Sequence, residues 1–422
     1  MSVLSYLKRK TECHPELIRK ALHIFMGLMT LSFPFIFDQA WPVAVLSIVS
    51  AVILSMVGKI SLLFSWGAVL KADGRTSYGQ ICFPLGIGIL FTLTFGDPLF
   101  FSIPVIILTL ADAVSALVGM RYGKHKYFTV DGAKSTEGSL AFFTFALLGT
   151  LIPLILFTDM ADDKILFTSL IMGILAMLFE GIAWRGFDNL AIPLGAFSVL
   201  KTHLVLSTEE LSIRLLILAI LLTFTICWRH KTTLTGSAIL GVALFAYFAY
   251  TVGGLAWLAM PLTVFIFYRW FMPTRFQTIE NTHSMYAVLS VASTGLLWLF
   301  WSHNSNSPEF IYPYTLAFAA HTAIIMIAHI RSRGINALRL RVIFGGTMRS
   351  WLLLFVPFII VSGFSSETLL LALIAPFFIL LPVIAFYLTQ NNIRNSSKTR
   401  WAKQAAFAVM ASFLGLIPVA LL

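Results

Sequence analysis

The chain has 422 residues, of which 59% are hydrophobic and only 11% are charged, whereas roughly 25% charged residues are usual in soluble domains. A soluble fold of this length would need more polar surface than these residues supply, which excludes a cytosolic enzyme, a nucleic-acid-binding protein and a disordered protein. Because the net charge of +11 fits the excess of Lys and Arg that membrane proteins keep on the cytosolic side, the composition predicts an all-α, polytopic integral membrane protein.

Apolar runs that end at charged residues, Gly or Pro recur along the whole chain and predict about 13–15 transmembrane helices. The run at 190–206 contains Pro193, Gly195 and Lys201, which favours a broken or re-entrant segment. Residues 60–70 are expected to lie at the membrane interface. The expected spans are 21–37, 41–57, 79–95, 99–119, 138–157, 165–184, 190–206, 211–228, 234–252, 254–271, 285–301, 312–330, 350–364, 368–388 and 404–421.

The charges predict a cytosolic N-terminus. With this orientation and alternating spans, only Lys164, Lys201 and Arg214 among the basic residues fall off the cytosolic side. The membrane would be the cytoplasmic membrane of a bacterium, or the endoplasmic reticulum or plastid membrane of a eukaryote. Asp112 and Glu180 lie inside or at the ends of apolar runs, where a carboxylate is costly and usually functional. We therefore expect the chemistry on the cytosolic face of residues 1–200.

The first motif is ELIRKALHI, residues 16–24. Its polar residues Glu16, Arg19, Lys20 and His23 recur at helical spacing and form one stripe that enters the membrane. A purely structural alternative is that Arg19 and Lys20 extend towards the lipid headgroups while His23 is an ordinary interior residue.

The second motif begins in LADAVSALVGMRYGKHK, residues 110–126. Asp112 shares one helical face with Ala116 and Gly119, so another backbone or a ligand can approach its carboxylate closely. A basic loop follows, from Arg121 to Lys126. This loop is not a Walker A motif, since it is one residue short and lacks the Ser or Thr after its Gly-Lys pair.

The same motif continues in GAKSTEG, residues 132–138, where two glycines flank polar side chains. Amide groups in such a turn, the ammonium of Lys134 and the start of the next helix favour binding of phosphate oxygens. The alternative is a cytosolic basic loop with a turn and no site. The residues of interest are Gly132, Lys134, Ser135, Glu137 and Gly138.

The third motif is EGIAWRGFDNLAIP, residues 180–193. If the helices bundle, Glu180 and Asp188 would lie near Asp112 and form an oxygen-ligand site suited to Mg²⁺. Alternatively, Asp188 caps the following helix and Glu180 pairs with Arg185.

Together, the three motifs resemble the CTP-dependent lipid kinases, in the same order and context. That family comprises the dolichol and phytol (polyprenol) kinases and a CTP-using diacylglycerol kinase. The middle motif also resembles the signature of CDP-diacylglycerol synthases. The resemblance covers residues 10–205, and one departure is Ala111 before Asp112, where many relatives have Gly. It implies a kinase domain over 1–205 that phosphorylates a long-chain isoprenoid alcohol such as phytol, polyprenol or dolichol.

The resemblance also implies a role for each motif residue. The catalytic residues would be Asp112, Glu137 and Asp188. Mg²⁺ would be held by Asp112, Glu180 and Asp188. The alcohol would be held by Arg19, Lys20 and His23. CTP or a related nucleotide would be bound by Arg121, Gly123, Lys124, Gly132, Lys134, Ser135, Gly138 and Asn189.

Residues 206–422 are predicted to form a second multi-span membrane domain without catalysis. Residues 231–269 resemble the opening of a phytyl-phosphate kinase-like family. Where that family has an acidic motif, this chain has AAHTAIIMIAHI, with His321 and His329 but no carboxylate. The resemblance thus implies a module that has lost its chemistry and serves in packing or lipid binding.

Two other functions stay open from the sequence. One is a phosphatidate cytidylyltransferase, because the middle motif is shared with the CDP-diacylglycerol synthases. The other is a lipid transporter, favoured by the number of spans. Against transport, the intramembrane carboxylates cluster at one cytosolic face and none lies near the midplane.

Overall fold

A computed structural model describes residues 15–60, 78–271, 283–332, 339–389 and 398–421 of the chain. Within them, ten helices are long and apolar enough to cross a membrane, and Ala40–Met56 and Gly79–Thr94 are shorter apolar helices. The predicted all-α polytopic class is therefore confirmed. The N-terminus and most of the interfacial segment expected at 60–70 fall outside the described residues.

The chain divides into two compact units, Met1–Ala219 and Ile220–Leu422. The border between them falls within one helix, α11 (Thr208–Trp228), whereas the sequence suggested a border at 205/206.

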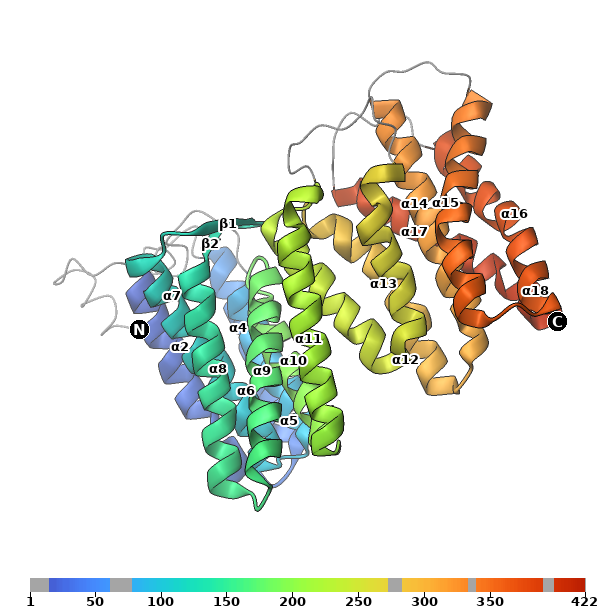
Figure 1. Cartoon of the computed structure of the whole chain (residues 1–422). Coiled ribbons are helices and arrows are strands. Elements are labelled where there is room, and N and C mark those ends of the chain that lie inside the picture. The colour runs from blue at the N-terminus through green and yellow to red at the C-terminus, as the bar shows by residue number, and fades with distance from the viewer. Residues whose placement is uncertain (1–14, 61–77, 272–282, 333–338, 390–397, 422) are drawn as a thin grey trace. The chain divides into compact units, whose positions relative to one another are not determined.

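Unit 1 is a helical bundle with one small hairpin of two antiparallel strands. Figure 1 shows the hairpin at one end of the unit 1 helices. Besides α11, its elements are α2 (Pro15–Thr30), α3 (Phe33–Ile36), α4 (Ala40–Ile60), α5 (Gly79–Thr94), α6 (Pro98–Ile106), η2 (Ile107–Ala111), α7 (Asp112–Tyr122), β1 (Lys126–Thr129), β2 (Gly132–Ser135), α8 (Thr136–Phe157), α9 (Asp162–Ile182) and α10 (Asp188–His203).

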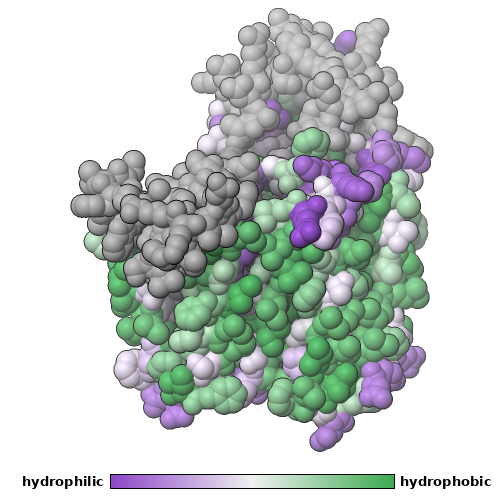
Figure 2. Space-filling model, turned by 90° about the vertical axis from the view of Figure 1, so that its left-hand side faces the viewer, coloured by the Kyte–Doolittle hydropathy of each residue, from purple (hydrophilic) through white to green (hydrophobic). Residues whose placement is uncertain are grey.

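Hydrophobic side chains cover much of the outside of the molecule, as expected where lipid replaces water. Figure 2 shows one such face, where hydrophilic residues gather towards its edges. Exposed residues of this kind include Trp41 and Ile53 of α4 and Leu156 of α8. Away from the helix ends, most backbone polar groups are paired within each helix, so these stretches can lie in lipid.

Three predicted spans differ from the observed helices. The segment expected to be broken at 190–206 is a continuous helix, α10, with Pro193 inside it. The spans expected at 234–252 and 254–271 are the two limbs of α12 (Gly236–Phe271), which bends at Gly254, where φ is 74°. This backbone region is readily open only to glycine.

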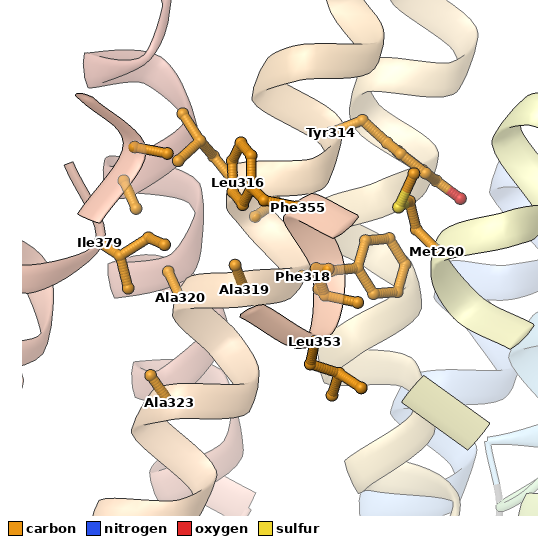
Figure 3. Packing of buried hydrophobic residues seen from close by; sticks show 14 of the residues in the cluster. Met260, Tyr314, Leu316, Phe318, Ala319, Ala320, Ala323, Leu353, Phe355 and Ile379 are labelled. Carbon is orange, nitrogen blue, oxygen red and sulfur yellow. The ribbon is translucent and has the colours of Figure 1, made fainter. Parts of the chain in front are cut away.

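Unit 2 is built around α14 (Ile311–Ser332), which is buried along most of its length. Figure 3 shows Ala319, Ala320 and Ala323 of α14 among larger side chains such as Phe318 and Phe355. Small residues let neighbouring helices approach closely where no water drives their association. The other elements are η3 (Arg229–Lys231), α12, α13 (Met285–Ser305), η5 (Pro308–Phe310), α15 (Arg339–Ser362), α16 (Ser366–Thr389), α17 (Lys398–Leu414) and α18 (Leu416–Leu421).

One close approach in unit 1 sets the position of α2. A Cβ atom on Gly27 would overlap the side chain of Thr109 in η2. Only glycine therefore lets α2 lie directly against this part of the 98–122 span, next to Asp112.

We expect Gly27→Val to lower the thermal stability of the detergent-solubilised protein, because the added methyl groups force α2 away from η2. Overpacking of this kind costs roughly 1–3 kcal/mol. Gly345→Val is the matched control, since no atom lies within 4 Å of the Cβ position in α15. Equal melting temperatures for the two variants would contradict the close packing of α2.

Candidate active site

Asp112 lies inside a membrane-spanning helix, directly after a turn of π-helix. The helices α6 and α7 form one apolar span, Pro98–Tyr122, joined by the π-helical turn η2 (Ile107–Ala111). Such turns occur frequently at functional sites. Asp112 follows this turn directly and is 8% exposed.

Two residues of the N-terminal motif contact Asp112. Lys20 Nζ donates to Asp112 Oδ2 at 2.6 Å, and Lys20 is only 4% exposed. His23 Nε2 lies 3.6 Å from the same oxygen and 3.1 Å from the carbonyl oxygen of Leu108. Since a carbonyl only accepts, this nitrogen carries a hydrogen. The structure thus joins the first motif to the second at a buried ion pair.

Arg19 has a different partner from its neighbours. Its guanidinium donates to the carboxylate of Glu16 at 2.9 and 2.5 Å. It also lies within electrostatic reach of both Asp112 and Asp188. The positive charge of Arg19 is therefore stabilised by carboxylates of all three motifs.

The GAKSTEG segment forms a strand and the start of a helix. Strand β2 pairs with β1, so that Tyr127 faces Lys134 across the hairpin. Ser135 caps α8, because its Oγ accepts from the Gly138 amide at 3.1 Å.

The glycines of this motif allow tight packing around Ser135. A Cβ atom on Gly119, Gly123 or Gly138 would come within 3.1, 2.7 and 3.1 Å of Ser135 Oγ, respectively. The end of α7 and the start of α8 therefore meet at the buried Ser135 hydroxyl. A phosphate-binding role for Gly123, Ser135 and Gly138 stays a prediction.

Lys134 forms the second ion pair of the site. Its ammonium donates to Glu180 Oε1 at 2.6 Å and to the Glu180 carbonyl oxygen at 2.5 Å. Burial disfavours the charge on Lys134, but the carboxylate of Glu180 outweighs burial and raises the pKa of Lys134 above its ordinary value. The negative charge of Asp188 also stabilises the ammonium of Lys134 electrostatically. The hairpin is thereby attached to the end of α9 and lies near the start of α10.

The remaining acidic residues have local partners. Asp188 accepts from both the backbone and the side-chain amide of Asn189, at 3.0 and 3.1 Å. Glu137 accepts from the backbone of His125 at 3.2 Å and lies 2.8 Å from His125 Nδ1. Glu137 therefore anchors the basic loop.

The three expected metal ligands do not form one cluster. Asp112 pairs with Lys20, Glu180 pairs with Lys134, and Asp188 bonds to Asn189. In the described part of the chain, no three His, Cys, Asp or Glu side chains gather closely enough to hold a metal ion.

The basic loop after α7 is solvent-exposed. Arg121 lies over the ring of Tyr122 at 5.5 Å, and Lys124 is exposed beside Gly123. Gly132 closes the hairpin with a φ of 139°. Nucleotide-binding roles for Arg121, Lys124 and Gly132 stay predictions.

Sequence reasoning missed two residues of the site. Asp131 accepts a hydrogen bond from the Arg185 amide, which joins the hairpin turn to the loop between α9 and α10. Tyr127 bonds to Ser139 Oγ at 2.8 Å. Burial, with help from Glu180, raises the pKa of Tyr127. The Asp131-Gly132 pair is a strong hairpin signal and could have revealed both.

Comparison with known proteins is informative for part of the chain. No protein-family model matches it, and no solved structure matches it. It is 29% identical over 196 residues to a phytol kinase of Synechocystis sp., which covers 45% of this chain and 80% of that protein. Over less than half of its length, this chain is thus similar to a phytol kinase.

Proposed function

We propose that the chain is a membrane kinase that transfers a phosphoryl group from CTP, or a related nucleotide, to a long-chain isoprenoid alcohol at the cytosolic face. The observation that carries the proposal is the buried Asp112, held by Lys20 and His23 within an apolar bundle. The similarity to a phytol kinase supports the same class of acceptor. Phytol, polyprenol and dolichol are the candidate substrates.

Phosphoryl transfer needs a group that accepts the alcohol's proton and cations that neutralise the transferred phosphate. In the proposed reaction, the hydroxyl oxygen attacks the γ-phosphorus, the bond from this phosphorus to the β–γ bridging oxygen breaks so that CDP leaves, and Asp112 accepts the hydroxyl proton. His23 orients the hydroxyl from the side of α2. Lys20 keeps Asp112 ionised in its buried position, since an unpaired buried carboxylate would take up a proton.

The nucleotide would be held on the hairpin side of the site. An ammonium has three donors, and Lys134 uses two of them on Glu180, which leaves one for a phosphate oxygen. Because the pKa of Lys134 is raised, its charge persists through neutral and mildly alkaline pH. Arg19 and the exposed Arg121 and Lys124 add positive charge for the remaining phosphates.

The donor chemistry of the site fits Mg²⁺, which prefers oxygen ligands and usually takes one or two protein carboxylates together with substrate phosphates. Asp188 is the best-placed ligand, because it is half-exposed and forms no ion pair with any described residue. Asp112 and Glu180 are each paired with a lysine, so Asp188 and the substrate phosphates would supply the oxygen ligands. The ion would neutralise charge on the transferred phosphate.

Labelled CTP tests the reaction class. Membranes containing the protein are incubated with phytol or with phosphatidate, and with CTP labelled at the α- or γ-phosphate. Transfer of γ-label alone to phytol supports the kinase. Transfer of α-label to phosphatidate would identify a cytidylyltransferase instead, and no transfer to either lipid would leave transport as the better explanation.

We expect Asp112→Asn to lower transfer to the alcohol by on the order of 100-fold or more, because the amide keeps the shape and cannot accept the proton. Turnover by the purified variant is compared with that of the parent at equal protein amount. Folding is checked by its melting temperature and by gel filtration in detergent. Near-normal turnover would remove Asp112 from the mechanism.

Lys134→Ala should raise the KM for CTP more than the KM for the alcohol, since Lys134 lies on the cytosolic hairpin. The expected loss in kcat/KM for CTP is roughly 2–4 kcal/mol. Lys126→Ala is the matched control, because Lys126 is exposed on the partner strand. A raised KM for the alcohol with unchanged CTP dependence would contradict the assignment.

Replacement of both histidines in the second half should leave specific activity within a few-fold of the parent. His321 is fully buried, and its Nε2 lies 2.9 Å from Ser290 Oγ; the side chain of His329 is outside the described part. The test is CTP-to-lipid transfer by the His321→Gln, His329→Gln double variant. Lost activity with intact folding would show that the second half contributes chemistry.

A further inference from the structure

An apolar groove of about 390 Å³ lies between α2, α4 and α5 of unit 1. None of the described residues that line it is charged. Its walls include Met26 and Thr30 of α2, Ser50 and Leu54 of α4, and Phe83 and Ile87 of α5. The groove is therefore suited to a hydrocarbon chain and not to a nucleotide.

One end of the groove reaches the candidate active site. Phe83 lines the groove, and its ring packs edge-to-face on the His23 ring with centroids 5.2 Å apart. His23 in turn lies 3.6 Å from Asp112. Along α2, His23, Met26 and Thr30 share one face, so the groove continues for roughly 10 Å along the helix from His23.

The groove opens to the outside of unit 1. Phe25, Met29 and Ile53 line its mouth and are 61%, 56% and 53% exposed, respectively. In a helical bundle that spans a membrane, large apolar side chains with this exposure face lipid. A ligand can thus enter sideways from the bilayer without passing through water.

We infer that this groove binds the hydrocarbon chain of the isoprenoid alcohol and delivers its hydroxyl to His23 and Asp112, an inference that rests on the proposed function. A neutral hydroxyl both donates and accepts, so it can bond to a histidine and a carboxylate at once. A phospholipid headgroup is larger and charged, and its burial beside the paired Lys20 and Asp112 would be costly. Met26 and Met29 adapt to a branched chain, because methionine is flexible and fills irregular gaps.

Filling the groove tests the inference. Ser50→Phe places a ring in the groove, and Ser55→Phe is the matched control on the same helix, outside the lining. We measure phosphorylation of geraniol, farnesol and phytol by each variant. Ser50→Phe should raise the KM for phytol by roughly tenfold, change that for geraniol less, and leave the KM for CTP unchanged. Identical behaviour of the two variants towards all three alcohols would overturn the groove assignment, provided the parent phosphorylates phytol.

Photo-labelling of the parent protein tests binding without relying on activity. A diazirine analogue of farnesol should label peptides of α2, α4 and α5, and excess phytol should compete with it while excess phosphatidylcholine should not. Equal competition by phosphatidylcholine would identify an ordinary lipid contact. Labelling instead at the unit 2 cavity lined by Phe245, Phe265 and Phe318 would also overturn the inference. If the parent phosphorylates no alcohol, the proposed function fails, and the labelling pattern alone decides the groove.

Discussion

The buried ion pair between Lys20 and Asp112 is the interaction on which the site depends. An isolated charge in an apolar bundle costs several kcal/mol, and removing one partner of a buried pair typically costs about 3–5 kcal/mol. The amphipathic helix α2 must therefore stay packed on the 98–122 span so that Lys20 reaches Asp112 at 2.6 Å. The contact between Gly27 and Thr109 makes this packing possible.

A second ion pair, between Lys134 and Glu180, likewise holds two separate elements of unit 1 together. Lys134 on the hairpin pairs with Glu180 at the end of α9, and Asp131 bonds to the backbone that leads to α10. The hairpin is thus attached at two points to the helices behind it. Arg19 lies within reach of Asp112 and Asp188. Polar groups from distant parts of the sequence are in this way brought together in unit 1, as the proposed reaction between a lipid and a nucleotide would require.

Unit 2 is organised differently. Its central helix α14 is surrounded by apolar side chains (Figure 3), and the carboxylates of its described residues, Glu309 and Glu367, lie at or just before helix starts. The buried His321 bonds to Ser290 within this core. This contact joins α13 to α14.

The sequence alone determined the fold class, most of the helices and the three motifs. Hydropathy is a sum over about 20 neighbouring residues, so it is local and can be read along the chain. It could not determine the partners of the motif residues. The pairing of Lys20 with Asp112 spans 92 residues, and that of Lys134 with Glu180 spans 46. Because such contacts depend on which helix faces pack together, only the tertiary structure decided that each expected metal ligand has its own partner. The tertiary structure alone also showed that Phe83, which lines the apolar groove, packs against His23.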